Sequence, residues 1–176
     1  TKSASDMALP FVAVGLLYRR GYFRQTIDAD GHQEHAYPNY DLSRLPVQQT
    51  FGHLLPFPAD PGVPGMPRIA VEAVVTAPIG DVRVITTHLE YYGLARRAAQ
   101  VEALRAIYAE GAAHARDPSP TKDDGGPFES LPWPAATIIT GDFNLEYTDP
   151  LHARMTAPFA DGTPPLADAW DVAHRG

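Results

Sequence analysis

The sequence predicts an α/β fold, because runs of β-branched residues alternate with one segment of helical periodicity. Residues 69–77, 82–89 and 136–140 are rich in valine, isoleucine and threonine, the residue types that favour strands. Between residues 93 and 108, apolar side chains recur at intervals of three and four, as on one face of a helix. Together these patterns favour a mixed fold in which that face of the helix lies in the core.

The N-terminal part of the chain predicts a β-hairpin. Residues 11–18 alternate larger apolar residues with alanine and glycine, and residues 22–27 resume a β-like pattern. Two arginines and Gly21 interrupt these runs, which is where a hairpin would turn. Residues 28–39 are polar and are predicted to form a loop.

The later elements follow from turn residues and apolar runs. Residues 69–77 and 82–89 are predicted to pair as antiparallel strands around a Pro/Gly turn, and Gly111 is predicted to end the helix. Residues 117–134 contain five prolines, which predicts a loop.

The end of the chain is predicted to contribute a strand and a short amphipathic piece. Residues 136–140 are short and apolar, which is typical of a fully buried strand. The amphipathic piece spans residues 166–172. Both tryptophans, Trp133 and Trp170, are expected in the core.

Composition excludes several classes of protein. The 176 residues carry a net charge of -7, are 44% hydrophobic and include no cysteine, so thiolate metal sites and cysteine nucleophiles are excluded. No apolar run approaches the roughly 20 residues that a bilayer requires, and the first six residues do not resemble a secretion signal. The sequence therefore predicts a soluble chain and favours a cytoplasmic location.

Two strand ends carry candidate functional side chains. Asp142 and Asn144 follow the run 136–140 and lie two residues apart, and His88 stands at the end of another strand. A carboxylate and an amide can hold a hard cation or a water molecule, and a histidine can stabilise charge on a phosphoryl oxygen. The alternatives are a turn or helix cap for the Asp-x-Asn pair and a structural role for the histidine.

The sequence motifs around these residues resemble those of the endonuclease/exonuclease/phosphatase superfamily, the DNase-I-like phosphohydrolases. The resemblance covers residues 42–176. It rests on T-H-L-E, a helix with R-x-x-Q, a β-branched strand running into G-D-F-N, and D-A-W at residues 168–170. It implies part of a two-sheet sandwich flanked by helices and hydrolysis of a phosphate ester with Mg²⁺ or Mn²⁺. The substrate would be nucleic acid, a lipid head group or a small molecule.

The same resemblance implies a role for each site residue. His88 would contact the scissile phosphate, Asp142 would orient the attacking water or bind the metal, and Asn144 would hold the phosphate and the metal. Arg97 and Gln100 match the helix pattern but are predicted to be packing and surface residues. The family's metal-binding glutamate and its terminal Asp-His pair have no counterpart in the sequence.

A different resemblance occupies the start of the chain. Residues 14–34 read V-G-L-L-Y-R-R-G-Y-F-R-Q-T-I-D-A-D-G-H-Q-E and are similar to a segment of bacterial α-glucan phosphorylases, glycosyltransferases that use pyridoxal phosphate. In that family the cofactor lysine lies in a later domain without counterpart here. The sequence thus predicts a phosphorylase-like hairpin segment over residues 1–41 and a partial phosphohydrolase domain over residues 42–176.

Two functions compete with phosphoester hydrolysis. The first is a catalytically inactive fragment or chimera, because part of the metal site is missing. The second is a carbohydrate-binding module derived from a phosphorylase, on the evidence of the first segment alone. If half of the sandwich is absent, the inner face of residues 71–75 and 84–86 lacks its partner sheet, and self-association through that exposed sheet face is expected.

Overall fold

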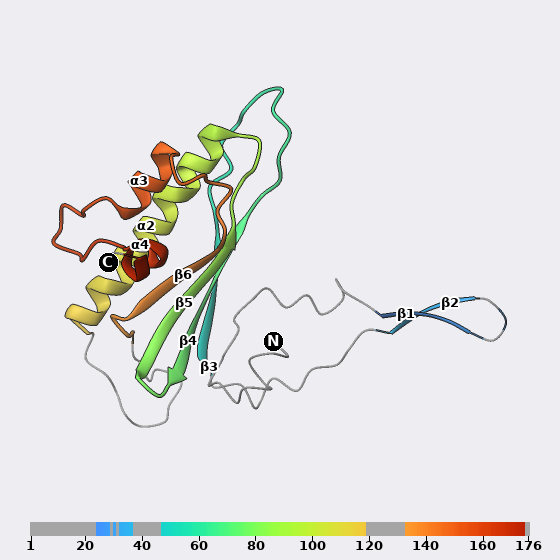
Figure 1. Ribbon diagram of the computed structural model, residues 1–176, viewed down its shortest axis with the longest axis horizontal. Coiled ribbons are helices and arrows are strands. Elements are labelled where there is room, and N and C mark those ends of the chain that lie inside the picture. Colours follow the sequence, from blue (N-terminus) through green and yellow to red (C-terminus); the bar gives the residue numbers. More distant parts are fainter. Residues whose placement is uncertain (1–23, 29, 31, 37–46, 119–132, 175–176) are drawn as a thin grey trace. The chain divides into compact units, whose positions relative to one another are not determined.

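A computed structural model describes residues 24–28, 30, 32–36, 47–118 and 133–174 (Figure 1). The chain divides into two compact units, residues 1–46 and 47–176. The α/β fold class is confirmed by the sheet and helices of the second unit. Whether the two units are the predicted phosphorylase-like segment and phosphohydrolase domain is not tested by this division.

The described part of the first unit is a β-hairpin. Strand β1 (Arg24–Ile27) pairs antiparallel with β2 (Gln33–Ala36). The Asp28 carboxylate holds the turn by accepting hydrogen bonds from the backbone N–H groups of Asp30 and His32, at 2.9 and 2.8 Å. The prediction of a polar loop over 28–39 is therefore wrong for β2. The prediction failed because β2 forms through pairing with its partner strand, and a local polar pattern does not reveal that pairing.

The predicted first arm of that hairpin, residues 11–18, lies outside the described residues, as does most of the predicted loop 117–134.

The second unit contains a four-stranded sheet in the order β3-β4-β5-β6 (Figure 1). Strands β3 (Val47–Leu54), β4 (Ile69–Ala77) and β5 (Gly80–His88) are antiparallel neighbours, and β6 (Thr137–Asp142) pairs parallel with β5. The predicted β4/β5 hairpin is confirmed. The two-sheet sandwich stays a prediction.

Strand β6 is less buried than its apolar sequence predicts. Among the described strands, only β5 pairs with it, so it is an edge strand of the sheet. Ile138 is 54% exposed, and none of the residues of β6 is buried. An apolar run of this length does not distinguish a central strand from an edge strand, which explains the difference from the prediction.

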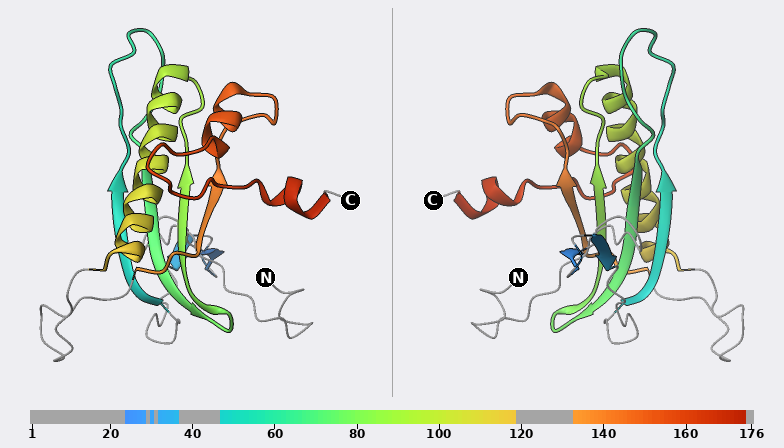
Figure 2. Two further views of the ribbon diagram at one scale, coloured as in Figure 1. Left: turned by 90° about the vertical axis from the view of Figure 1, so that its left-hand side faces the viewer. Right: turned by 90° about the vertical axis from the view of Figure 1, so that its right-hand side faces the viewer.

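Helix α2 (Leu94–Arg116) lies across one face of the sheet (Figure 2). It continues past Gly111, where the sequence predicts its end. A β-carbon at Gly111 would overlap the guanidinium of Arg83, so this glycine serves a close contact with β5 rather than a helix end. The core between helix and sheet contains Leu55, Ala70, Ile85, Leu89, Val101, Leu104 and Met155.

Two arginines of α2 fasten neighbouring loops by binding backbone carbonyls. Arg96 donates to the carbonyls of Pro58, Asp60, Val63 and Pro64. Arg105 is 4% exposed and donates to the carbonyls of residues 155, 157 and 158. Buried guanidinium groups thus supply donors that satisfy irregular backbone.

The chain ends in two short helices, α3 (Pro150–Thr156) and α4 (Ala169–His174). Asp149 caps α3 by accepting from the N–H of Leu151 at 2.8 Å. Helix α4 has no buried residue, and Trp170 is 68% exposed, so the expectation of Trp170 in the core is wrong. Within the described residues, no helix has the length and apolar character needed to cross a membrane.

Candidate functional site

The parallel pairing of β5 and β6 brings two of the predicted site residues together. His88 and Asp142 are register partners at the same end of the sheet. Their side chains, His88 Nε2 and Asp142 Oδ2, lie 3.7 Å apart and are 50% and 64% exposed. Solvent therefore screens this pair strongly.

Asn144 lies beside this pair, but its side chain makes a structural contact. Its backbone has φ of 50° and donates to Asp142 Oδ1 at 3.0 Å. Its Nδ2 donates to the carbonyl of Leu89 at 2.9 Å. Asn144 therefore ties the loop after β6 to the loop after β5. A shallow hollow of about 610 Å³ follows this loop and is lined by Tyr91 and residues 141–146.

These residues do not form a good Mg²⁺ site. Mg²⁺ requires near-octahedral oxygen ligands, whereas these residues offer one amide oxygen and one carboxylate, whose Oδ1 already accepts from a backbone N–H and whose Oδ2 faces an imidazole. Among the described residues, the cluster that could hold a metal is Asp28 with Asp30 and His32. In this cluster, the Asp28 carboxylate already accepts hydrogen bonds from the backbone of the β1–β2 turn. Binding of Mg²⁺ or Mn²⁺ by Asp142 and Asn144 remains a prediction.

Glu90 is a buried carboxylate that the sequence patterns do not single out. It is fully buried and accepts hydrogen bonds from the N–H groups of Tyr91, Tyr92 and Met66, at 2.9, 3.2 and 3.3 Å. Burial raises the pKa of its carboxyl, but these N–H donors and the charge of Arg68 outweigh burial, and the pKa lies below its usual value. Glu90 thus holds two loops together.

Gln100, which the sequence groups with Arg97 as packing and surface residues, shares this role. It is fully buried, accepts from the N–H of Glu90 at 2.8 Å and donates to the carbonyl of Pro56 at 3.2 Å. Arg97 donates to the carbonyls of Glu90 and Tyr91. The R-x-x-Q pattern in the helix therefore positions the loop after β5.

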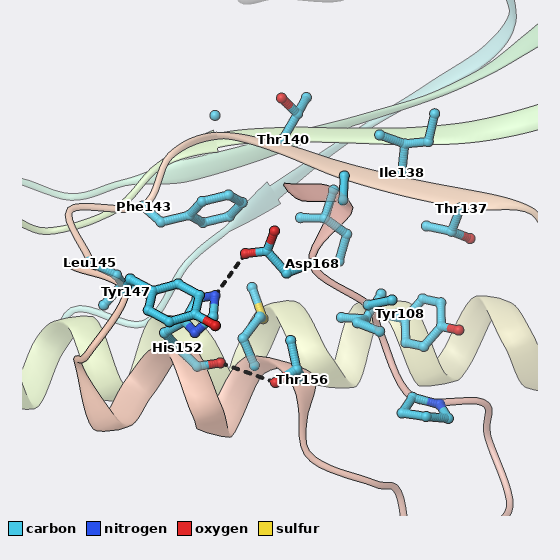
Figure 3. A pocket seen from close by; sticks show the side chains of 17 residues that line it. Tyr108, Thr137, Ile138, Thr140, Phe143, Leu145, Tyr147, His152, Thr156 and Asp168 are labelled. Carbon is cyan, nitrogen blue, oxygen red and sulfur yellow. Dashed lines mark hydrogen bonds and ion pairs between the residues drawn. The ribbon is translucent and has the colours of Figure 1, made fainter. Parts of the chain in front are cut away.

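A second hollow, of about 700 Å³, contains a histidine paired with an aspartate (Figure 3). His152 Nε2 lies 2.8 Å from Asp168 Oδ2, and both side chains are about three-quarters buried. The hydrogen bond from His152, followed by one from the N–H of Trp170, lowers the pKa of Asp168. A carboxylate at one ring nitrogen fixes the orientation of the imidazole.

The sequence contained part of the signal for this pair. The D-A-W motif begins at Asp168, but His152 is part of no local motif. His152 reaches Asp168 because α3 and the segment that follows it converge beside β6. The other lining residues are mainly apolar. They come from α2, β6, the loop after β6, α3 and the segment that follows α3: Tyr108, Thr137–Gly141, Phe143, Leu145, Tyr147, Met155, Thr156, Pro165, Leu166, Ala167 and Ala169.

Sequence comparison with curated proteins finds phosphorylases. The chain is 55% identical to a glycogen phosphorylase of Mycobacterium tuberculosis over 47 residues, which are 27% of this chain and 5% of that protein. The same figures hold for the glycogen phosphorylase of Mycobacterium bovis. A maltodextrin phosphorylase of Thermococcus litoralis is 37% identical over 71 residues, 40% of this chain and 8% of that protein.

These matches cover a small part of each relative. The chain spans only 5 to 8% of the length of the curated relatives it matches. No protein-family model matches the chain. The predicted metal-dependent phosphoester hydrolase of the endonuclease/exonuclease/phosphatase type is wrong, because the relatives found are phosphorylases and not phosphoester hydrolases. What the comparisons do support is similarity to glycogen and maltodextrin phosphorylases over a fragment of their length.

Proposed function

We propose that this chain is a chimera that combines a phosphorylase-derived segment with a separate α/β unit and has no catalytic activity of its own. The observation that carries this proposal is 55% identity confined to 47 residues, 5% of the glycogen phosphorylase it matches. Identity of that level over that length favours common descent. So small a share of an enzyme does not supply an active site, whose groups must be held together by the surrounding fold.

The geometry of the predicted site supports the same proposal. His88 and Asp142 are at least half exposed, and catalytic groups work best where water is excluded. Asn144 is committed to the carbonyl of Leu89. These residues therefore act in this chain as the ends of two strands and the loop that joins them.

Absence of phosphorylase activity is the first test. Purified chain, supplied with maltodextrin, inorganic phosphate and pyridoxal phosphate, is expected to release no glucose 1-phosphate above the blank. The maltodextrin phosphorylase of Thermococcus litoralis serves as the positive control in the same assay. In parallel, hydrolysis of a chromogenic phosphodiester with Mg²⁺ is expected to equal that of the His88→Ala and Asp142→Ala variants. Product formation in either assay by folded chain contradicts the proposal.

Binding of an α-glucan by the first unit is a second candidate. The observation in its favour is that the relatives found are named for glycogen and maltodextrin. Under this proposal the chain is retarded in gels containing maltodextrin, and Asp28→Ala abolishes the retardation, because Asp28 holds the β1–β2 turn through two backbone N–H groups.

The second unit offers a matched control for that variant. Asp161 holds a turn in the same way, accepting from the N–H of Thr163 at 3.0 Å. Asp161→Ala is therefore expected to keep the retardation. An unretarded wild-type chain removes glucan binding as a function and leaves the chimera proposal standing.

We also propose self-association of the chain. The sheet face away from α2 is less exposed at its centre than the sequence predicts, because Ala73 and Val75 are buried. Its exposed apolar side chains are Leu54, Ile69 and Ile138, which are 77%, 41% and 54% exposed. Exposed apolar side chains on one face of a sheet favour association of copies.

A further inference from the structure

Strand β6 leaves backbone groups unpaired at the outer edge of the sheet. The carbonyls of Ala136 and Asp142 accept from the N–H groups of β5 and its continuation, Arg83 and Leu89, at 2.9 Å each. Alternate residues of a strand direct their backbone groups to opposite sides, so the N–H and C=O groups of Thr137 and Ile139 face outward. Within the described residues, no backbone group pairs with them.

This edge has none of the features that usually prevent strands from pairing. The run T-I-I-T carries no charge and no proline, whereas natural edge strands are commonly protected by lysine, proline or a bulge. Asp142, the first charge, stands at the end of β6. The edge can therefore accept another strand.

Helix α4 extends beyond this edge (Figure 2). Trp170 and Val172 are 68% and 58% exposed. The start of the helix is nevertheless fixed, because Asp168 Oδ1 accepts from the N–H of Trp170 at 2.7 Å and the Tyr147 hydroxyl donates to Asp171 at 3.1 Å. A helix held in this position would cover a strand added beside β6, as α2 covers the rest of the sheet.

The 700 Å³ hollow lies along the same edge. Ile138 and Thr140 lie on one side of the strand and Thr137 on the other (Figure 3), and all three line the hollow. The hollow therefore reaches around the free edge of β6. Its walls include Phe143 and Met155, so it can receive an apolar side chain.

We propose that the occupant of this edge is a second copy of the chain, whose β6 pairs antiparallel with the first. Each copy offers an uncharged strand edge, an exposed apolar helix and an apolar hollow, and a two-fold axis can set the two strand edges together and the helix of each copy near the hollow of the other. Pairing centred on Ile139 sets Thr137 opposite Gly141 and keeps the two copies of Asp142 apart. Trp170 of each copy then packs toward the hollow of the other. This inference rests on the proposed self-association and assigns it to the edge of the sheet.

Sedimentation equilibrium of the full chain tests this interface. The mass is expected to rise with concentration from 19.1 kDa to twice that value. Trp170→Glu is expected to weaken dimerisation at least about tenfold, because tryptophan anchors dominate interface energetics. Ile139→Pro is expected to do the same while β5 and β6 stay paired, because it removes an outward N–H. Circular-dichroism melting shows whether each variant is folded.

Two further variants separate this interface from others. Ile79→Glu lies in the turn between β4 and β5 at a residue that is 88% exposed, and dimerisation is expected to persist. Leu54→Glu alters the sheet face. Dimerisation lost in Leu54→Glu but kept in Trp170→Glu overturns the edge interface and leaves self-association in place. A monomer at every concentration overturns both. Neither result bears on the chimera proposal, which the activity assays described above test separately.

Discussion

Replacing Arg83 with methionine is expected to lower the free energy of unfolding by about 3 to 5 kcal/mol, because it leaves the buried carboxylate of Glu72 with the ring of His53, 2.9 Å away, as its remaining partner. Arg83 and Glu72 have no exposed side-chain area, and Arg83 Nε lies 3.1 Å from Glu72 Oε1. Arg83 Nη2 also donates to the carbonyl of Ile107 in α2 at 3.0 Å. The pair therefore joins two strands to the helix that covers them.

The double variant Glu72→Leu with Arg83→Met isolates the ionic contribution. Burial lowers the pKa of Arg83 and Glu72 acts in the opposite direction, so the pair carries a large desolvation cost. Removing both charges at similar volume is expected to restore most of the lost stability. Urea unfolding gives both values. A single variant as stable as the parent would contradict the argument, and so would a double variant as unstable as the single one.

An exposed ion pair provides the control for this measurement. Arg116 Nη2 lies 3.8 Å from Asp161 Oδ2, and both side chains are about half exposed. Arg116→Met is expected to cause a much smaller loss of stability than Arg83→Met, because exposed pairs are screened by water. A comparable loss would mean that lost packing of the arginine stem, rather than burial of the charge, sets the size of the effect.

Local sequence patterns predicted the elements whose residues repeat regularly. The β-branched runs of β4 and β5 and the apolar spacing of α2 appear where the sequence places them. Strand β3 was not predicted, because its run V-Q-Q-T-F-G-H-L is half polar and its pairing with β4 decides its conformation. The end of α2 was misplaced because Gly111 makes room for a side chain from another element.

The candidate site was predictable only in part. The sequence places His88 and Asp142 at strand ends, and they meet because β5 and β6 pair in parallel, a pairing that the sequence left open. The pairing of His152 with Asp168 could not be foreseen, because it depends on where α3 and the final segment meet. The buried network of Glu90 and Gln100 was also missed, because it depends on the contacts of the loop after β5 with Gln100 and with the N–H of Met66, which local patterns do not show.

Substituting Gly141 with alanine is expected to be the most damaging small change in the second unit. Gly141 has φ of 137°, a conformation that L side chains rarely adopt, and a β-carbon there would overlap the carbonyl oxygen of Thr87. Backbone strain and overlap each cost about 1 to 3 kcal/mol. The overlapping atom belongs to the backbone of Thr87 in the neighbouring strand β5. The overlap can therefore be relieved only if β5 and β6 move apart. Thermal unfolding is expected to show the combined loss.

Two other glycines separate these effects. Gly80 has φ of 107° but open space around its β-carbon position, so Gly80→Ala carries the backbone strain alone. Gly52 has neither a positive φ nor a neighbour within 4 Å, and Gly52→Ala is expected to leave stability nearly unchanged. The loss of stability in Gly141→Ala is expected to exceed the loss in Gly80→Ala. The difference between the two then measures the effect of the close approach of β6 to β5. If the two losses are equal, overlap with Thr87 contributes nothing, and strain alone explains why glycine occupies the point where β6 brings Asp142 beside His88.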